Sequence, residues 1–156
     1  MIDSQYYEAQ CYIRGTSLAA AYHYTNGAKS DYTYYVQNAH SDVVNLTDAD
    51  GAVTKTYHYN AFGVEQNINA TDTNAFRYCG EYYDAETGTI YLRARYYDPR
   101  IGRFNRRDSF MGRRTDPLSL NRYVYCKNNP IRYTDPSGYD AVDGRSRIYP
   151  VSPSFC

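Results

Sequence analysis

Seven residues of this chain are cysteines or histidines, whose side chains commonly bind metals or act as nucleophiles and bases. They are the cysteines Cys11, Cys79, Cys126 and Cys156 and the histidines His23, His40 and His58. None of the cysteines forms a Cys-Xaa-Xaa-Cys pair, and the histidines lack the spacing of metal ligands. The spacing therefore predicts no metal site, redox motif or cofactor. It leaves open whether the cysteines are isolated buried thiols or form two disulfides.

The charges exclude one class of partner. The 17 basic and 17 acidic residues cancel, and no long block carries one sign, so binding to nucleic acid by neutralising phosphates is not expected. A short basic run is interpreted as a solvated loop; it comprises Arg103, Arg106, Arg107, Arg113 and Arg114. The first eight residues lack the charged and apolar regions of a secretory signal, and no apolar stretch reaches membrane-spanning length.

Tyrosine dominates the large side chains that could build a core. It supplies 21 of the 26 aromatic residues, and tryptophan is absent from the 156. A core made of tyrosine must leave its hydroxyls at a wet edge or hydrogen-bond them. This composition favours a thin β-layer over a compact apolar globule, and the length allows one domain or a fragment of a larger protein.

Turn residues divide the chain into short predicted strands. Residues 42–47 and 52–59 form a predicted hairpin across Gly51, and residues 77–83 pair with 89–97 in a second. In the second strand of this hairpin, alternation places Ile90, Leu92, Ala94 and Tyr96 on a core face. The opposite face is then a ladder of tyrosine and arginine whose guanidinium groups stack on rings or reach carboxylates: Tyr91, Arg93, Arg95 and Tyr97.

The unit Tyr-Xaa-Tyr recurs four times, at residues 22–24, 32–34, 57–59 and 123–125. Each unit presents two rings to one side of a strand and behaves as a degenerate repeat, and too few copies of such a repeat leave open sheet edges. We therefore predict an all-β fold of successive antiparallel hairpins with little helix. Short helical turns are expected only at residues 16–22 and 117–121, the latter capped by Asp116.

Four ordered groups of motifs cover most of residues 32–138. They include Tyr82-Tyr83-Asp84, Tyr96-Tyr97-Asp98, Gly102-Arg103-Phe104 and Asp135-Pro136-Ser137-Gly138, preceded by the segments 46–51 and 57–63. With these motifs the chain resembles the C-terminal part of an RHS-repeat, or YD-repeat, protein. The resemblance implies degenerate repeat strands over residues 1–75, an RHS repeat-associated core domain over 76–139 and a short tail over 140–156.

In complete proteins of this family, the tyrosine-rich sheet winds into a hollow spiral shell around a C-terminal effector polypeptide. The core domain curls inward and closes one end. The resemblance thus implies a structural module, truncated or orphaned, whose partners are a preceding repeat shell and an effector. Full-length relatives are secreted or at the cell surface, whereas this chain is too short to enclose a cargo alone, so self-association through open edges is expected.

Several relatives also cleave themselves after the Asp-Pro-Xaa-Gly-Leu motif. Residue by residue, the two family aspartates fall on Asp108 and Asp135, and the scissile bond on Tyr139–Asp140. Two close carboxylates can share one proton, so that one activates water while the other donates a proton. Arg107 or Arg122 is expected to orient a carboxylate or lower its pKa. Tyr139 stands where leucine is usual and Ser109 where many relatives have proline, and Asp135 also suits a turn before Pro136.

Three functions therefore compete. The first is the structural shell module, which has no activity on small molecules. The second is an aspartyl-type autoprotease that acts once, after Tyr139. The third is a carbohydrate- or surface-binding module, because exposed tyrosines suit stacking on sugars, although tyrosines that line a shell interior account for the same composition.

Overall fold

The computed structural model describes residues 9–112 and 114–143. The expectations for the N-terminal eight residues, Arg113, Cys156 and the tail beyond residue 143 lie outside this part of the chain. Within it, no helix is long and apolar enough to cross a membrane.

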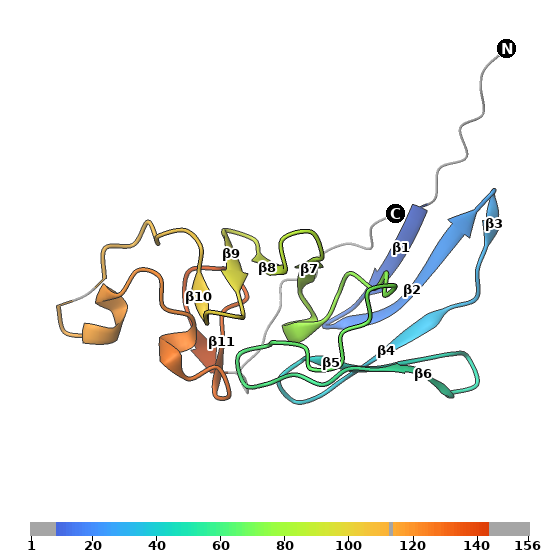
Figure 1. Cartoon of the computed structure of the whole chain (residues 1–156), viewed down its shortest axis with the longest axis horizontal. Helices are drawn as coiled ribbons and strands as arrows, with labels where there is room; N and C mark the ends of the chain where they lie inside the picture. The colour runs from blue at the N-terminus through green and yellow to red at the C-terminus, as the bar shows by residue number, and fades with distance from the viewer. Residues whose placement is uncertain (1–8, 113, 144–156) are drawn as a thin grey trace, which may run out of the picture.

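The predicted all-β fold is confirmed. Figure 1 shows a six-stranded sheet at one end of the long axis, loops that follow β10 at the other end, and a four-stranded sheet between them. The strands of the first sheet are β1 (Ala9–Arg14), β2 (Leu18–Thr25), β3 (Ala28–Lys29), β4 (Thr33–Gln37), β5 (Val43–Thr47) and β6 (Val53–Thr56). The second sheet contains β7 (Tyr82–Asp84), β8 (Thr89–Leu92), β9 (Arg95–Asp98) and β10 (Arg103–Phe104).

The remaining elements are short. A two-stranded ribbon pairs β11 (Tyr133–Thr134) with β12 (Val142–Asp143), and three 3-10 turns are η1 (Tyr78–Gly80), η2 (Pro117–Leu120) and η3 (Cys126–Asn128). The turn predicted after Asp116 is present as η2, but the Asp116 side chain does not cap it. Its carboxylate instead lies 3.2 Å from the Lys127 ammonium group.

The first sheet is built from sequential antiparallel hairpins in the order β1-β2-β4-β5-β6, with β3 paired to β2. The hairpin predicted at residues 42–59 is confirmed, because β5 pairs with β6 and Gly51 has a φ of +82° in the connection. The helical turn predicted at residues 16–22 is wrong. This segment enters β2, where pairing with β1 and burial of Leu18 and Ala20 outweigh the helix propensity of its alanines.

The second sheet corrects the prediction of one strand over residues 89–97. The β7–β8 hairpin is present, but the chain reverses at Arg93 and Ala94, and β8 pairs with β9. Arg93 has a φ of +60°, which a residue in a continuous strand would not adopt. The reversal exchanges the faces beyond it, so Arg95 and Tyr97 are buried and Tyr96 is exposed.

Tyrosines form much of the core, as the composition predicts. The larger apolar cluster contains Tyr78, Tyr97 and Tyr125, and a smaller one contains Val43, Leu46 and Tyr57. Two buried tyrosine hydroxyls of the larger cluster are hydrogen-bonded: Tyr97 donates to the carbonyl of Phe62 at 2.8 Å and Tyr78 to the carbonyl of Ala61 at 3.1 Å. These bonds satisfy the polar atoms that would otherwise make a tyrosine core unfavourable.

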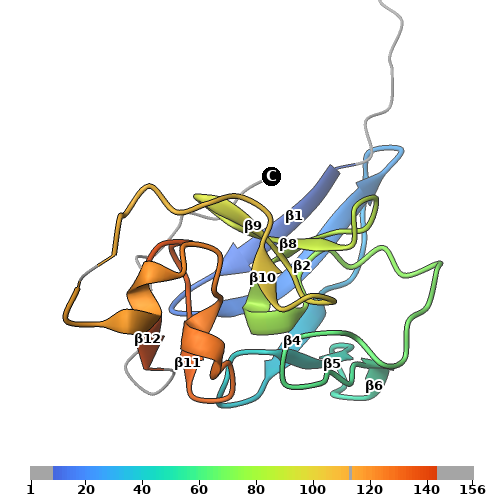
Figure 2. The ribbon, with the colours of Figure 1, turned by 60° about the vertical axis from the view of Figure 1, so that its left-hand side comes forward.

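Hydrogen bonds join the two sheets where β5 meets η1. The Val43 N–H donates to the Arg77 carbonyl at 3.0 Å, and the Cys79 N–H donates to the Asp42 carboxylate at 2.9 Å. Figures 1 and 2 agree that the four-stranded sheet lies between the six-stranded sheet and the C-terminal loops. The division into domains at residues 75 and 76 stays a prediction.

The two ends of the first sheet differ from its interior. Within the described residues, β6 pairs only with β5, and β1 pairs only with β2. Val53 on β6 is 57% exposed, and three of the four residues of this strand are exposed. An edge of this kind offers its backbone groups to a further strand.

Candidate functional site

A buried arginine lies at the centre of the segment that carries both predicted aspartates. Arg95 begins β9 and is 5% exposed, with its guanidinium carbon 3.6 Å from the centre of the Phe104 ring. One nitrogen of this guanidinium group, Nη2, lies 2.9 Å from Asp108 Oδ2 and 3.7 Å from Asp135 Oδ2. Arg95 therefore brings together two carboxylates that are far apart in the sequence.

The guanidinium of Arg95 also binds backbone carbonyls on two loops. It donates to the carbonyl of Gly138, to that of Arg122 at 3.1 Å and to that of Tyr139 at 3.5 Å. These bonds fasten the segment around Gly138 to β9. A planar group with five donors suits this arrangement, and lysine cannot reproduce it.

Asp108 is held from both sides by the loop that follows β10. Its N–H donates to the Arg122 carbonyl at 2.9 Å, and its Oδ1 accepts the N–H of Phe110 at 2.8 Å. The side chain of Arg122 donates to the backbone carbonyl of Asp108. Oδ2 remains directed at Arg95, and the residue is 7% exposed.

Asp135 organises the turn that precedes the predicted cleavage bond. Its Oδ1 accepts the N–H groups of Ser137 at 3.3 Å, Gly138 at 2.8 Å and Tyr139 at 3.1 Å. Gly138 has a φ of +74°, and a Cβ there would lie 2.3 Å from the Leu92 carbonyl oxygen, so only glycine suits the position. Asp135 thus has the role of a turn residue, and it faces Arg95 as well.

Burial gives Asp135 an unusual titration. The residue is 3% exposed, and this burial raises the pKa of its carboxyl above the ordinary 3.8, against the lowering effects of Arg95 and of the N–H groups that it binds. A raised pKa is the property that a proton-donating carboxyl needs.

Two cavities open beside the paired aspartates. One has a volume of 590 Å³ and is lined by Arg95, Asp108, Asp135, Tyr139 and Asp140 among others. The other has a volume of 740 Å³ and reaches Asp108 from the side of Arg106 and Arg107. Water can therefore approach the carboxylates and the Tyr139 carbonyl from these cavities.

The structure reassigns the arginine that the sequence placed beside the carboxylates. Arg107 is exposed, and among the described residues it forms no ion pair with either aspartate. Arg122 binds the backbone of Asp108 and not its carboxylate. Arg95 takes the predicted role, because the reversal at Arg93 turns its side chain inward. The sequence signal for it was the tyrosine–arginine ladder, in which guanidinium groups were expected to reach carboxylates.

We predict that Asp135→Asn is more stable than the unchanged protein at neutral pH and equally stable below pH 3.8. A carboxyl whose pKa is raised in the folded state contributes stability below its unfolded pKa and loses that contribution as pH rises. Asparagine keeps the Oδ1 acceptor for the three N–H groups and carries no charge. Urea unfolding across this pH range measures the difference.

Asp72→Asn is expected to change the stability at neutral pH in the opposite direction. Burial raises the pKa of Asp72, but its contacts lower it more, the first being the Lys55 ammonium group 2.8 Å away, so the net shift is downward. This carboxylate stabilises the fold above pH 3.8 and ceases to do so as pH falls. Asp72→Asn should therefore be less stable at neutral pH and converge with the unchanged protein in acid. If Asp135→Asn and Asp72→Asn changed the stability at neutral pH in the same direction, the opposite pKa shifts assigned to the two carboxyl groups would be wrong.

Together, the tyrosine core, the sequential hairpins and the arginine-bound aspartates define a structural β-module of the kind found in tyrosine-rich repeat shells. The Teneurin YD-shell family matches residues 25–131, more than half of the 156. The chain belongs to this family, and it is a structural module of such a shell.

Individual proteins agree with this assignment. The chain is 41% identical over 119 residues to the tRNA3(Ser)-specific nuclease WapA of Bacillus spizizenii, covering 74% of this chain and 5% of that protein. It is 36% identical over 101 residues to toxin subunit YenC2 of Yersinia entomophaga, covering 62% and 10%. In the crystal structure of TcdB2-TccC3-TEV, the similar region is 26% identical with a TM-score of 0.69, and covers 84% of this chain and 7% of that one. The chain thus spans a small part of the length of its relatives.

Proposed function

We propose that this module closes one end of a YD-repeat shell that encloses a C-terminal effector polypeptide. The observation that supports the proposal most is the arrangement of the two sheets. The six-stranded sheet ends at the exposed strand β6, while the segment from η1 onward folds back through the contacts of Val43 and Cys79. The partners would be the preceding repeats and the effector, and the place of action outside the cell or at its surface.

Light scattering after size-exclusion chromatography tests whether the open edge is a docking surface. The chain alone should associate in a concentration-dependent manner, because the edge strand β6 offers its backbone groups to a further strand. Val53→Lys places a charge on this edge and should return the chain to a monomer. Val36→Lys is the matched control, because Val36 is 42% exposed on the interior strand β4 and should leave association unchanged. A monomer at every concentration would contradict the proposal.

A second candidate function is a single self-cleavage of the Tyr139–Asp140 bond. It is supported by the two carboxylates on Arg95, by the adjacent cavity, and by the contact between Arg95 and the Tyr139 carbonyl oxygen. Asp108 would take a proton from the attacking water, and Asp135, whose pKa is raised, would protonate the departing amide nitrogen of Asp140. The oxygen of the water would remain on the new carboxyl group of Tyr139, and Arg95 would hold the carbonyl.

Intact mass spectrometry at acidic and neutral pH measures this cleavage. Loss of residues 140–156 with time is expected, and Asp108→Asn should abolish it. Asp98→Asn is the control, because Asp98 pairs with the exposed Arg100 on the same sheet. A full-length mass that persists at every pH removes this candidate without affecting the shell module.

A further inference from the structure

A histidine, an aspartate and a cysteine meet at the junction of the two sheets. His40 and Asp42 lie in the connection between β4 and β5, and Cys79 lies in η1. His40 Nδ1 is 2.9 Å from Asp42 Oδ1 and 3.8 Å from Cys79 Sγ. One nitrogen, one oxygen and one sulfur, all within 4.8 Å of one another, therefore face a common point.

The surrounding structure fixes these three groups. Asp42 is 7% exposed and Cys79 6%. Asn38 donates to Asp42 Oδ2 at 2.9 Å, and the Cys79 N–H donates to Oδ1 at 2.9 Å, so the carboxylate has little freedom to rotate. Cys79 has a φ of +55°, a conformation that is costly for a residue with a Cβ. Hydrogen bonds from surrounding groups, such as those to Asp42, orient the ligands of metal centres.

We propose that His40, Asp42 and Cys79 bind a divalent transition metal ion of the zinc class. Imidazole nitrogen, carboxylate oxygen and thiolate sulfur are all zinc ligands, and metal–ligand bonds of about 2.0–2.3 Å in a tetrahedron place ligand atoms roughly 3.3–3.7 Å apart. The nitrogen–oxygen separation of 2.9 Å is shorter than such an edge, and the nitrogen–sulfur separation of 3.8 Å is slightly longer. Binding displaces to solvent both the thiol proton and the proton that His40 Nδ1 donates to Asp42, because a thiolate and an unprotonated ring nitrogen are the ligands.

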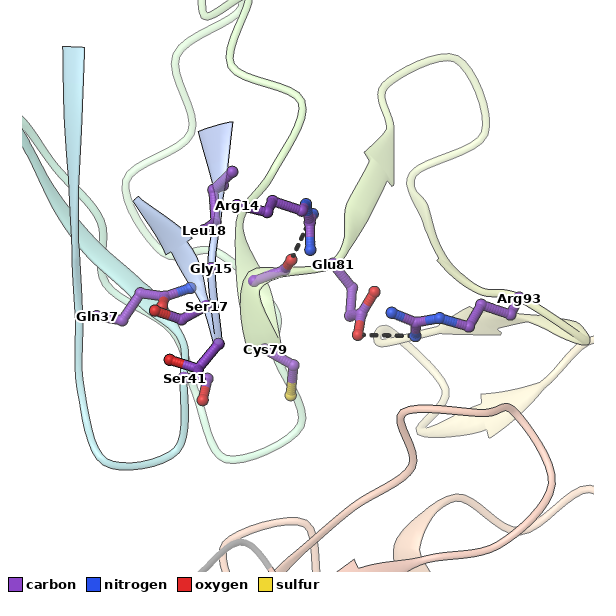
Figure 3. Close-up of a pocket in the computed structure, with 11 residues that line it drawn as sticks. Arg14, Gly15, Ser17, Leu18, Gln37, Ser41, Cys79, Glu81 and Arg93 are labelled. Atoms are coloured by element: carbon purple, nitrogen blue, oxygen red, sulfur yellow. Dashed lines mark hydrogen bonds and ion pairs between the residues drawn. The ribbon is translucent and has the colours of Figure 1, made fainter. Parts of the chain in front are cut away.

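Space and a further donor are available for a fourth position. A cavity of 460 Å³ reaches His40 and Asp42 from the side of Tyr78, so a water molecule can complete the shell. The hydroxyl of Tyr125 lies 3.7 Å from Cys79 Sγ. A second cavity, of only 20 Å³, borders Cys79 and is also lined by Arg14. Figure 3 shows that the Cys79 sulfur is directed away from Arg14.

The geometry favours a metal site over a cysteine nucleophile with a histidine base. In a nucleophilic triad the base uses one ring nitrogen for the nucleophile and the other for the aspartate. Here Nδ1 of His40 faces both Asp42 and Cys79. Nε2 is buried and has no hydrogen-bond partner in the described part of the chain. A metal ion bound by all three residues would explain why Asp42 and Cys79 both approach this one nitrogen of His40.

Such an ion would fasten the repeat sheet to the segment that folds back over it. His40 and Cys79 are 39 positions apart; His40 lies in a connection of the first sheet, and Cys79 lies in η1, which precedes the second sheet. A bound ion that is absent from the unfolded chain stabilises the folded state by mass action. The proposed metal is thus a structural link and does not depend on the second function of self-cleavage.

Titration of the full chain with Zn²⁺ and Co²⁺ tests the proposal. After dialysis against a chelator, one Zn²⁺ per chain should bind and raise the melting temperature. Co²⁺ should give a thiolate-to-cobalt charge-transfer band and the intense d–d bands of a tetrahedral site. Cys79→Ser should abolish the charge-transfer band, and His40→Ala should weaken Zn²⁺ binding by at least the roughly 10–100-fold typical of changes around metal ligands.

Two controls separate the site from other thiols and imidazoles. Cys126→Ser removes the neighbouring buried thiol, and His23→Ala removes an exposed imidazole on β2; both should bind Zn²⁺ and Co²⁺ as the unchanged chain does. Absence of the charge-transfer band in the unchanged chain would overturn the proposal even if a variant failed to fold. Unaltered metal affinity in folded Cys79→Ser or His40→Ala would overturn it too.

Discussion

Arg95→Met is expected to lower the free energy of unfolding by about 3–5 kcal/mol, the cost typical of removing one partner of a buried ion pair. The guanidinium is 5% exposed, and its loss leaves Asp108 without its cation at 2.9 Å and Asp135 without its cation at 3.7 Å. It also removes the Arg95 donor from the Gly138 carbonyl and leaves the Arg122 carbonyl with only the N–H of Asp108. Methionine restores apolar contact with Phe104 but none of these polar interactions.

Urea unfolding at neutral pH measures this loss as a shift of the midpoint. Arg95→Lys should recover only part of the stability, because an ammonium group cannot bind two carboxylates and several carbonyls in one plane. The matched control is Arg100→Met, since Arg100 is exposed and pairs with Asp98 at 2.7 Å on the surface. It should leave the urea midpoint almost unchanged, because an exposed ion pair contributes little to stability. Equal effects of Arg95→Met and Arg100→Met would show that Arg95 does not organise the site.

Tyr97→Ala is expected to cost about 3–5 kcal/mol, the range for removing a large buried aromatic side chain. Tyr97 has 0% exposure and stacks on Tyr125 with ring centres 3.9 Å apart. Its hydroxyl donates to the Phe62 carbonyl, which lies in the loop beyond β6. The side chain therefore packs the core of the second sheet and joins that sheet to the loop that follows β6.

Tyr97→Phe separates the two contributions. It keeps the stacking but leaves the Phe62 carbonyl without its donor, so we expect a loss of about 1–3 kcal/mol. Tyr96→Ala is the control, because the neighbouring Tyr96 is 40% exposed and should cost less than about 1.5 kcal/mol even with its contact to Tyr91. If the effects at positions 96 and 97 were reversed, the turn at Arg93 and the inward face of β9 would be wrong.

Local signals were sufficient to predict the hairpins. Gly51 and the turn at residues 84–88 follow segments rich in strand formers, and strands on either side of each turn pair as expected. The reversal at Arg93 and Ala94 was missed, because neither residue is a usual turn former and the sequence from Ile90 to Tyr97 alternates without interruption. The turn is closed locally by the Ala94 N–H, which donates to the Leu92 carbonyl at 2.7 Å, and the same N–H also approaches the distant Ser137 carbonyl at 3.3 Å.

The sites depend on contacts that no spacing reveals. Asp108 and Asp135 were selected through a family resemblance, but Arg95 joins them only after the chain reverses and the segment around Gly138 packs on β9. His40 and Cys79 lie 39 positions apart, so their approach follows from the packing of η1 against β5 and not from a motif. The tyrosine-rich core was predictable, because composition alone required buried hydroxyls to find acceptors.

Hydrogen exchange of the backbone amides at low and high protein concentration tests most directly whether this chain is a shell module with an open edge. We predict that amides of β6 gain protection at high concentration, while those of the interior strands β4 and β5 are protected equally at both concentrations. Protection that does not change in β6, or that appears only in the loops beyond β10, would contradict it.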